Sequence, residues 1–327
     1  MHMVISSLAG AALSGWSACS NDIGGFKGPM PDAELLVRWI QSGIAQPRFC
    51  IHSWNDGNTC TELWSHPEVL PVVRAAVNFR YHLLPYLYHL SLRNHETGQP
   101  ICRPLVLEFP TDVNLRQGRD TASHQVSSND WMLGSSLLVC PVTQPQALER
   151  AVYLPGDRPW FSWQTGDWHS PGDWITLRNT LQEPAPILLM RQGTGVPLLA
   201  AITGHSTVSI AQSPKGGGRV VLVAPGPDSM TVQWYEDDGV TPTAQATRWQ
   251  VTVTVQSPQV DGTRVVHGRA TCVAQGSVPF DLPFDAVTVV GALDLPLEGG
   301  KPVDSAALVA AMWPKAGVQT TVPLAFD

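Results

Sequence analysis

Charged residues are scarce in this chain of 327 amino acids, since Asp, Glu, Lys and Arg make up 14% of it. Basic residues number 20 against 27 acidic ones, which gives a formal net charge of −7. A protein that binds nucleic acid neutralises phosphates with a basic surface, so this balance argues against a nucleic-acid partner. No stretch approaches the roughly 20 apolar residues of a membrane-spanning helix, and we expect no membrane partner either.

Paired cysteine motifs are also missing. The six cysteines are scattered, without a C-x-x-C pair or the spacing of a metal site. Several lie in apolar runs such as 137–140, where a reduced thiol behaves as a small hydrophobic group. Because reduced cysteines are typical of a reducing compartment, we predict a cytoplasmic protein with no disulfide, no cofactor and no metal site.

Residues 1–16 lack the Lys or Arg of a signal peptide's first region and a clear cleavage site. They favour a helix of small residues packed on a sheet. Tryptophan, in contrast, is abundant, with 12 residues in the chain. These rings have two interpretations, because flat aromatic side chains fill hydrophobic cores and also stack on the C–H faces of sugars.

The first hundred residues alternate between predicted strands and helices. A short apolar run at 15–19 is a strand candidate that ends at Ser20-Asn21-Asp22. Asp32 is placed to cap a helix whose apolar residues recur every three or four positions up to Ile44. A second strand candidate at 48–51 ends at His52. The connections are long enough for the two strands to pair in parallel.

A long helix is predicted after the second strand. Ser65 and Glu68 have the spacing of a capping box, and Pro67 falls in the first turn. Pro85 should kink or divide the helix, and Gly98 should end it.

From about residue 100 the helical period is lost, and short strands separated by Gly, Pro and Asp-Gly turns take its place. Such a pattern is typical of β-sandwiches. Asp238-Gly239 is a predicted hairpin turn, and 195–199 a boundary between two units. The predicted strands are 136–142, 151–154, 174–178, 187–191, 220–223, 231–235, 249–255, 264–270 and 286–290.

Asp22 and His52 are the first candidates for a functional site. In α/β barrels, functional side chains lie where strands end and the following loops begin, so both residues should face one cleft. Taken alone, His52 has a second interpretation as a buried structural histidine, and Asp22 as a turn or helix cap. Position by itself leaves these alternatives open.

Several motifs occur here in one order: SNDIGGF, PRFCIHSWND, TELW, RYHLLPYLY, LGSSLLVCPV, AVYLPGDRPWFSWQTG and YEDDG. Together they resemble the C-terminal half of glycoside hydrolase family 31, the retaining α-glucosidase and α-xylosidase family. The resemblance covers most of residues 5–240.

The resemblance implies an α/β plus all-β fold, in which the C-terminal remnant of a (β/α)₈ barrel precedes two antiparallel β-sandwich domains. The expected domains are the partial barrel at 1–100, with barrel strands seven and eight, a proximal sandwich at 101–198 and a distal sandwich at 199–327.

The resemblance also implies roles for three residues. Asp22 would accept hydrogen bonds from sugar hydroxyls, Phe26 would form part of an apolar wall, and His52 would bond a hydroxyl of the −1 sugar. The family often has an arginine two residues before that histidine, where this chain has Cys50.

The same family cleaves α-glycosidic bonds by double displacement, which requires two carboxyl groups about 5–5.5 Å apart. No W-x-D-M-N-type nucleophile motif and no G-D-N/Q-type acid motif occurs here. We therefore expect an incomplete family member with no catalytic residue of its own, which binds an α-linked oligosaccharide or α-glucoside. It would self-associate or pair with a missing N-terminal half. The alternative is a non-catalytic carbohydrate-binding or structural β-sandwich protein.

Overall fold

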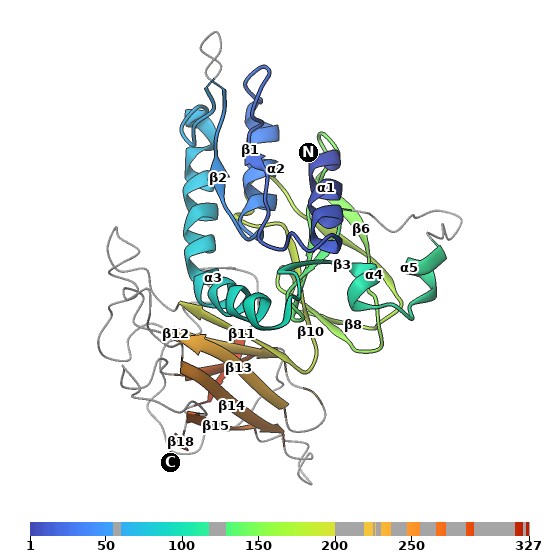
Figure 1. Cartoon of the computed structure of the whole chain (residues 1–327), viewed down its shortest axis with the longest axis vertical. Helices are drawn as coiled ribbons and strands as arrows, with labels where there is room; N and C mark the ends of the chain where they lie inside the picture. The colour runs from blue at the N-terminus through green and yellow to red at the C-terminus, as the bar shows by residue number, and fades with distance from the viewer. Residues whose placement is uncertain are drawn as a thin grey trace. The chain divides into compact units, whose positions relative to one another are not determined.

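A computed structural model describes residues 1–54, 60–117, 129–199, 219–224, 226, 230–236, 247–255, 266–272, 286–290, 318–322 and 325–326 (Figure 1). The chain divides into two compact units. The first comprises Met1–Arg80, Arg93–Trp160 and His169–Leu189, and the second Tyr81–Leu92, Phe161–Trp168 and Met190–Asp327.

The chain begins with helix α1 (His2–Leu13), which confirms the predicted small-residue helix. The strand predicted at 15–19 is wrong, because these residues close the helix instead. Gly15 has a φ of 87°, and the Trp16 N–H donates to the Ala11 carbonyl. This is the backbone pattern that ends many helices at a glycine. Trp16, expected in a buried strand, is 72% exposed.

Helix α2 (Ala33–Gly43) confirms the prediction based on its cap and period. The Leu35 N–H donates to the Asp32 carboxylate at 2.8 Å, which satisfies a backbone donor at the helix start. Gly43 lets the helix approach the strand beside it, since a Cβ there would lie 2.4 Å from Ile23 Cδ1. The absence of that side chain therefore permits direct packing of α2 on β1.

Strands β1 (Asp22–Ile23) and β2 (Cys50–Ile51) pair in parallel, with Asp22 beside Cys50 and Ile23 beside Ile51. This confirms the expected parallel neighbours. Within the described residues these two strands form a sheet of their own and do not close a barrel.

The long helix α3 (Leu70–Thr97) begins after a short 3₁₀ turn, η1 (Pro67–Val69). The predicted capping box is wrong. The Ser65 hydroxyl accepts the Glu62 N–H at 2.9 Å, so it serves the preceding turn.

The interior and end of α3 follow the prediction more closely. Pro85 lies inside the helix, which bends without being divided (Figure 1). Proline removes one hydrogen bond of the helix and crowds the preceding turn, so a bend is the expected result. Gly98 ends the helix with a φ of 71°, and its N–H donates to the Asn94 carbonyl.

A six-stranded sheet follows in the order β3-β4-β5-β10-β7-β8, and β6 pairs with β9 in a separate two-stranded sheet. Buried apolar side chains between these strands form a core that includes Met132, Leu138 and Trp160. Two short helices, α4 (Leu105–Glu108) and α5 (Val113–Gln117), lie between β3 and β4 in the chain. The strands are β3 (Cys102–Pro104), β4 (Trp131–Leu133), β5 (Leu137–Cys140), β6 (Glu149–Tyr153), β7 (Trp160–Ser162), β8 (Trp168–His169), β9 (Trp174–Arg178) and β10 (Ile187–Arg191).

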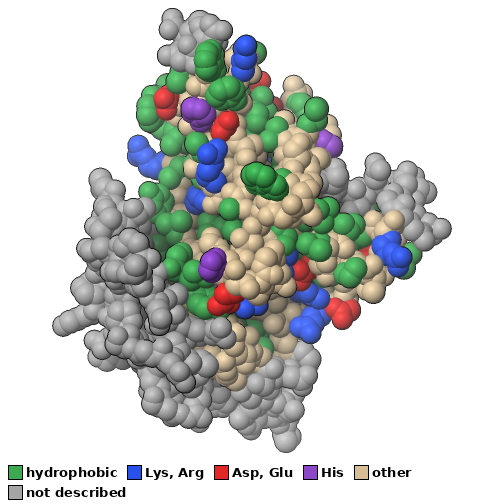
Figure 2. All heavy atoms as spheres, viewed as in Figure 1, with side chains coloured by type: hydrophobic (Ala, Val, Ile, Leu, Met, Phe, Trp, Pro, Cys, Tyr) green, Lys and Arg blue, Asp and Glu red, His purple; other side chains and the backbone are tan. Residues whose placement is uncertain are grey.

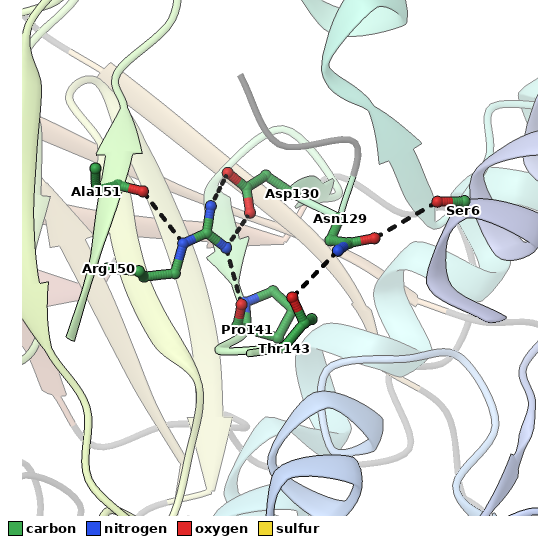
Figure 3. Close-up of polar contacts among 7 residues, drawn as sticks. All are labelled: Ser6, Asn129, Asp130, Pro141, Thr143, Arg150 and Ala151. Atoms are coloured by element: carbon green, nitrogen blue, oxygen red, sulfur yellow. Dashed lines mark hydrogen bonds and ion pairs between the residues drawn. The ribbon is translucent and has the colours of Figure 1, made fainter. Parts of the chain in front are cut away.

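Polar contacts tie α1 and the start of β4 to the segments around β5 and β6 (Figure 3). The Ser6 hydroxyl donates to Asn129, whose amide donates in turn to Thr143. Next to it, buried Asp130 receives two bonds from the Arg150 guanidinium, at 2.7 and 2.8 Å. Paired hydrogen bonds of this kind fix both side chains in one geometry.

Two four-stranded sheets follow in the second unit, in the orders β11-β12-β16-β17 and β13-β14-β15-β18. They correct the expectation of purely antiparallel sheets, since β12–β16 and β15–β18 are parallel pairs. The chain leaves β12 for three strands of the other sheet before it returns to β16, and such a crossover produces parallel neighbours. The strands are β11 (Thr194–Leu199), β12 (Arg219–Ala224), β13 (Met230–Glu236), β14 (Thr247–Val255), β15 (Val266–Cys272), β16 (Ala286–Val290), β17 (Val318–Val322) and β18 (Ala325–Phe326).

All nine strands predicted beyond residue 135 are present, with small shifts at their ends. Residues 195–199, predicted as a boundary, belong to β11. The predicted turn at Asp238-Gly239 lies outside the described residues.

Within the described residues, no helix combines the length and apolarity needed to cross a membrane. The same part of the chain holds no group of three His, Cys, Asp or Glu side chains that could bind a metal ion. Cys19, Cys50, Cys60, Cys102 and Cys140 are free thiols.

Candidate sugar-binding site

The pairing of β1 with β2 determines where the predicted site residues lie. Ile23 is fully buried against α2, so the alternation of side chains along a strand turns Asp22 to the opposite face. Asp22 lies beside Cys50, and Cys50 comes two residues before His52. Asp22 is therefore the first residue of β1, and His52 directly follows β2, the parallel neighbour of β1.

The glycines of SNDIGGF form a tight turn after β1. Gly24 and Gly25 have φ values of 88° and 89°, a region that favours glycine. The Gly25 N–H donates to the Asp22 carbonyl at 3.0 Å and closes the turn. A side chain on Gly24 would also collide with Thr61, since its Cβ would lie 2.6 Å from Thr61 Cγ2. This turn directs the chain toward Phe26.

Three rings come together in the loops after β1 and β2. The Phe26 ring lies 5.4 Å from the His52 ring and 6.1 Å from the Trp54 ring. The Trp54 N–H donates to the Phe26 carbonyl and joins the two loops through their backbones. Phe26 is 44% exposed and Trp54 is 55% exposed, so both present apolar surface. Figure 2 shows hydrophobic side chains gathered at this end of the first unit.

Trp54 was not among the predicted site residues. The available signals were its place two residues after His52, within the motif PRFCIHSWND, and the abundance of tryptophan in the chain. Neither signal could show that the ring meets Phe26, which lies 28 positions earlier in the chain.

The Asp22 carboxylate is held by an arginine that the sequence analysis did not single out. Arg48 Nη2 donates to Asp22 Oδ1 at 3.0 Å, and Arg48 Nε donates to the Ser20 hydroxyl at 3.3 Å. The Asp22 side chain is 26% exposed and the Arg48 side chain 56% exposed. The ion pair is therefore accessible from the surface.

A second network fixes the backbone next to Asp22. The indole N–H of Trp39 donates to the Asn21 side chain at 2.6 Å, and the Asn21 amide donates to Gln46 at 2.9 Å. The buried Gln46 amide donates to the Ser42 hydroxyl. Helix α2 and the segment before β2 thus hold the SND stretch from one side.

Arg80 of α3 orders the segment that leads into β2. Its guanidinium donates to the carbonyls of Ile44, Gln46 and Pro47 at 2.7–2.9 Å and lies over the Phe49 ring. Burial lowers the pKa of Arg80 to about 10. At neutral pH the side chain therefore still carries its charge.

The loop after His52 is fixed by its own polar contacts. The Thr61 N–H donates to the Ser53 hydroxyl at 2.9 Å. Because Thr61 also lies against Gly24, this contact links the loop after β2 to the turn after β1.

Chemically, the cluster combines a carboxylate, an imidazole, a guanidinium and two exposed aromatic rings. Such a set suits a ligand that has both hydroxyl groups and apolar C–H faces. Double displacement at a sugar needs more, namely two carboxyl groups about 5–5.5 Å apart.

Comparisons with known proteins agree with this geometry. Residues 1–90 match the "Glycosyl hydrolases family 31 TIM-barrel domain", and residues 98–195 match the "Glycosyl hydrolase family 31 C-terminal domain". These two matches define the family of the chain. The chain belongs to glycoside hydrolase family 31.

Named relatives include neutral α-glucosidase C of Mus musculus, which is 38% identical over 229 residues, or 70% of this chain and 24% of the relative. An α-xylosidase of Saccharolobus solfataricus is 30% identical over 240 residues, or 70% of this chain and 29% of the relative. The solved structure of a family 31 α-xylosidase from Xanthomonas citri matches with a TM-score of 0.64 and 25% identity, over 93% of this chain and 31% of that one. The chain thus spans between a quarter and a third of these relatives.

Proposed function

We propose that this chain supplies part of the sugar-binding site of an α-glucosidase-type glycoside hydrolase. The observation that carries the proposal is the parallel pairing of β1, which begins at Asp22, with β2, which His52 follows, together with the ring contact of Phe26 and His52 in a family 31 chain. The ligand would be the terminal sugar of an α-linked oligosaccharide or α-glucoside.

Each residue has a role that its chemistry supports. The Asp22 carboxylate accepts hydrogen bonds from sugar hydroxyls, and a charged acceptor forms stronger bonds than a neutral one. His52 donates to or accepts from a hydroxyl of the −1 sugar. Phe26 and Trp54 supply an exposed apolar wall for the C–H faces of the ring.

The chemical step would be retaining double displacement in the complete enzyme. It needs a carboxylate nucleophile and a carboxylic acid that protonates the leaving oxygen. Asp22 is committed to binding, and the sequence carries neither of the motifs expected for those two groups. We place both catalytic carboxyl groups on other strands of the family's barrel.

The architecture that fits this role has three parts. Residues 1–100 would be a partial (β/α)₈ barrel with its strands seven and eight, and 101–198 and 199–327 would be proximal and distal β-sandwiches. The boundaries of the two family matches, 1–90 and 98–195, support the first division.

The remaining proposals concern the cellular compartment and the partners of the chain. The free thiols at Cys19, Cys50, Cys60, Cys102 and Cys140 fit a reducing, cytoplasmic compartment. The net charge of −7 disfavours a nucleic-acid partner. A second copy of the chain, or the rest of a family 31 barrel, would cover the exposed apolar residues of α1.

The proposal is tested with an aryl α-glucoside assay on the folded, purified chain. We expect no turnover above background, because general acid catalysis alone contributes roughly 10²–10⁴-fold and no group here supplies it. Turnover that disappears in Asp22→Ala would show that the chain has its own catalytic apparatus. Addition of a family 31 barrel fragment that carries both carboxyl motifs should produce activity if the two pieces assemble.

A further inference from the structure

We propose that Arg48 is a sugar-binding residue that works as a pair with Asp22, so that one sugar hydroxyl bonds to both side chains. The inference rests on the sugar-binding function proposed above and adds a residue to it. Cys50 occupies the position where the resembling family often has an arginine. Arg48 lies two positions earlier and reaches Asp22 from there.

The Arg48 side chain points to the same face of the sheet as Asp22. Phe49, the next residue, faces the helices, since it lies under the Arg80 guanidinium and near Gly43. Arg48 points the other way, across the pair of strands to Ser20 and Asp22. It therefore lies on the face of the sheet to which Asp22 belongs.

In the part of the chain that the structure describes, the ion pair of Arg48 with Asp22 leaves one atom of each side chain without a hydrogen bond. Arg48 uses Nε for Ser20 and Nη2 for Asp22 Oδ1, and within the described residues no hydrogen bond or ion pair involves its Nη1. The same holds for Asp22 Oδ2. The ion pair thus holds one donor and one acceptor that are available to a ligand, on side chains that are 56% and 26% exposed.

A sugar hydroxyl matches this pair, because it has one hydrogen to donate and two lone pairs that accept. It would donate to Asp22 Oδ2 and accept from Arg48 Nη1. Ser20 holds the guanidinium in place, so little rotational freedom is lost when the ligand binds. Stability gives no comparable reason for the pair, since an exposed ion pair contributes roughly 0–1 kcal/mol.

The experiment measures binding of methyl α-D-glucoside and its four monodeoxy analogues (positions 2, 3, 4 and 6) by ligand-observed NMR. The proteins are the unmodified chain, Arg48→Met, Arg48→Lys and Asp22→Ala. Arg93→Met is the matched control, because Arg93 also forms an exposed ion pair, with Glu96. Circular dichroism confirms that each variant is folded.

We expect Arg48→Met to weaken binding of the parent glucoside about tenfold, the effect of losing one charged hydrogen bond. Arg48→Lys should weaken binding of the parent glucoside less, because the ammonium group keeps the charge. Some loss is still expected, because this group cannot reach Ser20 and the sugar together. For the analogue that lacks the shared hydroxyl, the chain and Arg48→Met should bind equally well. Arg93→Met should bind as the unmodified chain does.

Three results would overturn the inference. If Arg48→Met binds the parent glucoside normally while Asp22→Ala does not, Asp22 acts without Arg48 and the proposed function stands. If Arg48→Met weakens binding of all four analogues equally, Arg48 only maintains the fold of the site. If the unmodified chain binds none of these sugars, the proposed function fails, and this inference fails with it.

Discussion

At the scale of single residues, the end of the second strand at His52 was predictable from a polar residue after an apolar run, whereas Asp22 begins β1 and does not follow a strand at 15–19. Arg48 and Trp54 could not be found in this way. Their contacts, with Asp22 and Phe26, join segments more than 20 positions apart, and no local pattern encodes them. The roles of Asp22, Phe26 and His52 in sugar binding remain predictions.

Arg80 carries a prediction at this scale. Replacement by Met removes the donors to the carbonyls of Ile44, Gln46 and Pro47, and leaves partly buried acceptors without partners. We expect the free energy of unfolding to fall by about 3 kcal/mol. Urea unfolding measures the change, with Arg74→Met, on the exposed side of the same helix, as the control. Equal stability of Arg80→Met and the unmodified chain would refute this role.

At the scale of elements, the long periodic helices and nine of the strands beyond residue 135 were predictable, because their hydrophobic patterns extend over several residues. The first strand was misplaced since an apolar run at 15–19 belongs to the end of α1. Strands β3, β4, β7 and β8 were missed because two or three residues are too few to show alternation. Pairing with neighbours, which the sequence does not show, defines them.

His82 gives the element-scale prediction. Its Nδ1 hydrogen-bonds the Leu199 carbonyl of β11 at 2.7 Å, and burial lowers the pKa of His82 below its usual value. The folded state thus takes up the proton less readily than the unfolded chain. Stability should be full above about pH 6.5 and should fall as the pH drops through the lowered pKa.

The measurement is urea unfolding at several pH values between 7 and 5. His82→Gln keeps an amide donor but does not titrate, so its stability should decline less over this range. His95→Gln, at the exposed end of α3, is the control and should follow the unmodified chain. Identical pH profiles for the chain and His82→Gln would contradict the assignment.

At the scale of the whole molecule, the family and the mixture of helical and β-rich regions were predictable from ordered motifs. The mixed sheets of the second unit were not, because strand direction depends on the path of the chain between sheets. We propose that this chain binds the sugar and that other strands of the family's barrel supply the chemical step.

Self-association is the first prediction at this scale. Met3, Leu13 and Trp16 expose apolar side chains on and just after α1, with exposed fractions of 81%, 56% and 72%. Exposed apolar side chains favour association in water. Sedimentation velocity should show oligomers that become smaller when Met3 and Trp16 are both replaced by Ser. A strictly monomeric chain at micromolar concentration would disprove this.

The most direct measurement is binding of methyl α-D-glucoside to the folded chain and to Asp22→Ala and His52→Ala, followed by ligand-observed NMR. The account predicts weak binding by the unmodified chain that each substitution reduces about tenfold or more, because each removes a hydrogen bond to the sugar. Asp32→Ala, which alters only the α2 cap, should bind normally if the helix stays folded. Binding that is unchanged in both site variants, or absent from the unmodified chain, would contradict the account.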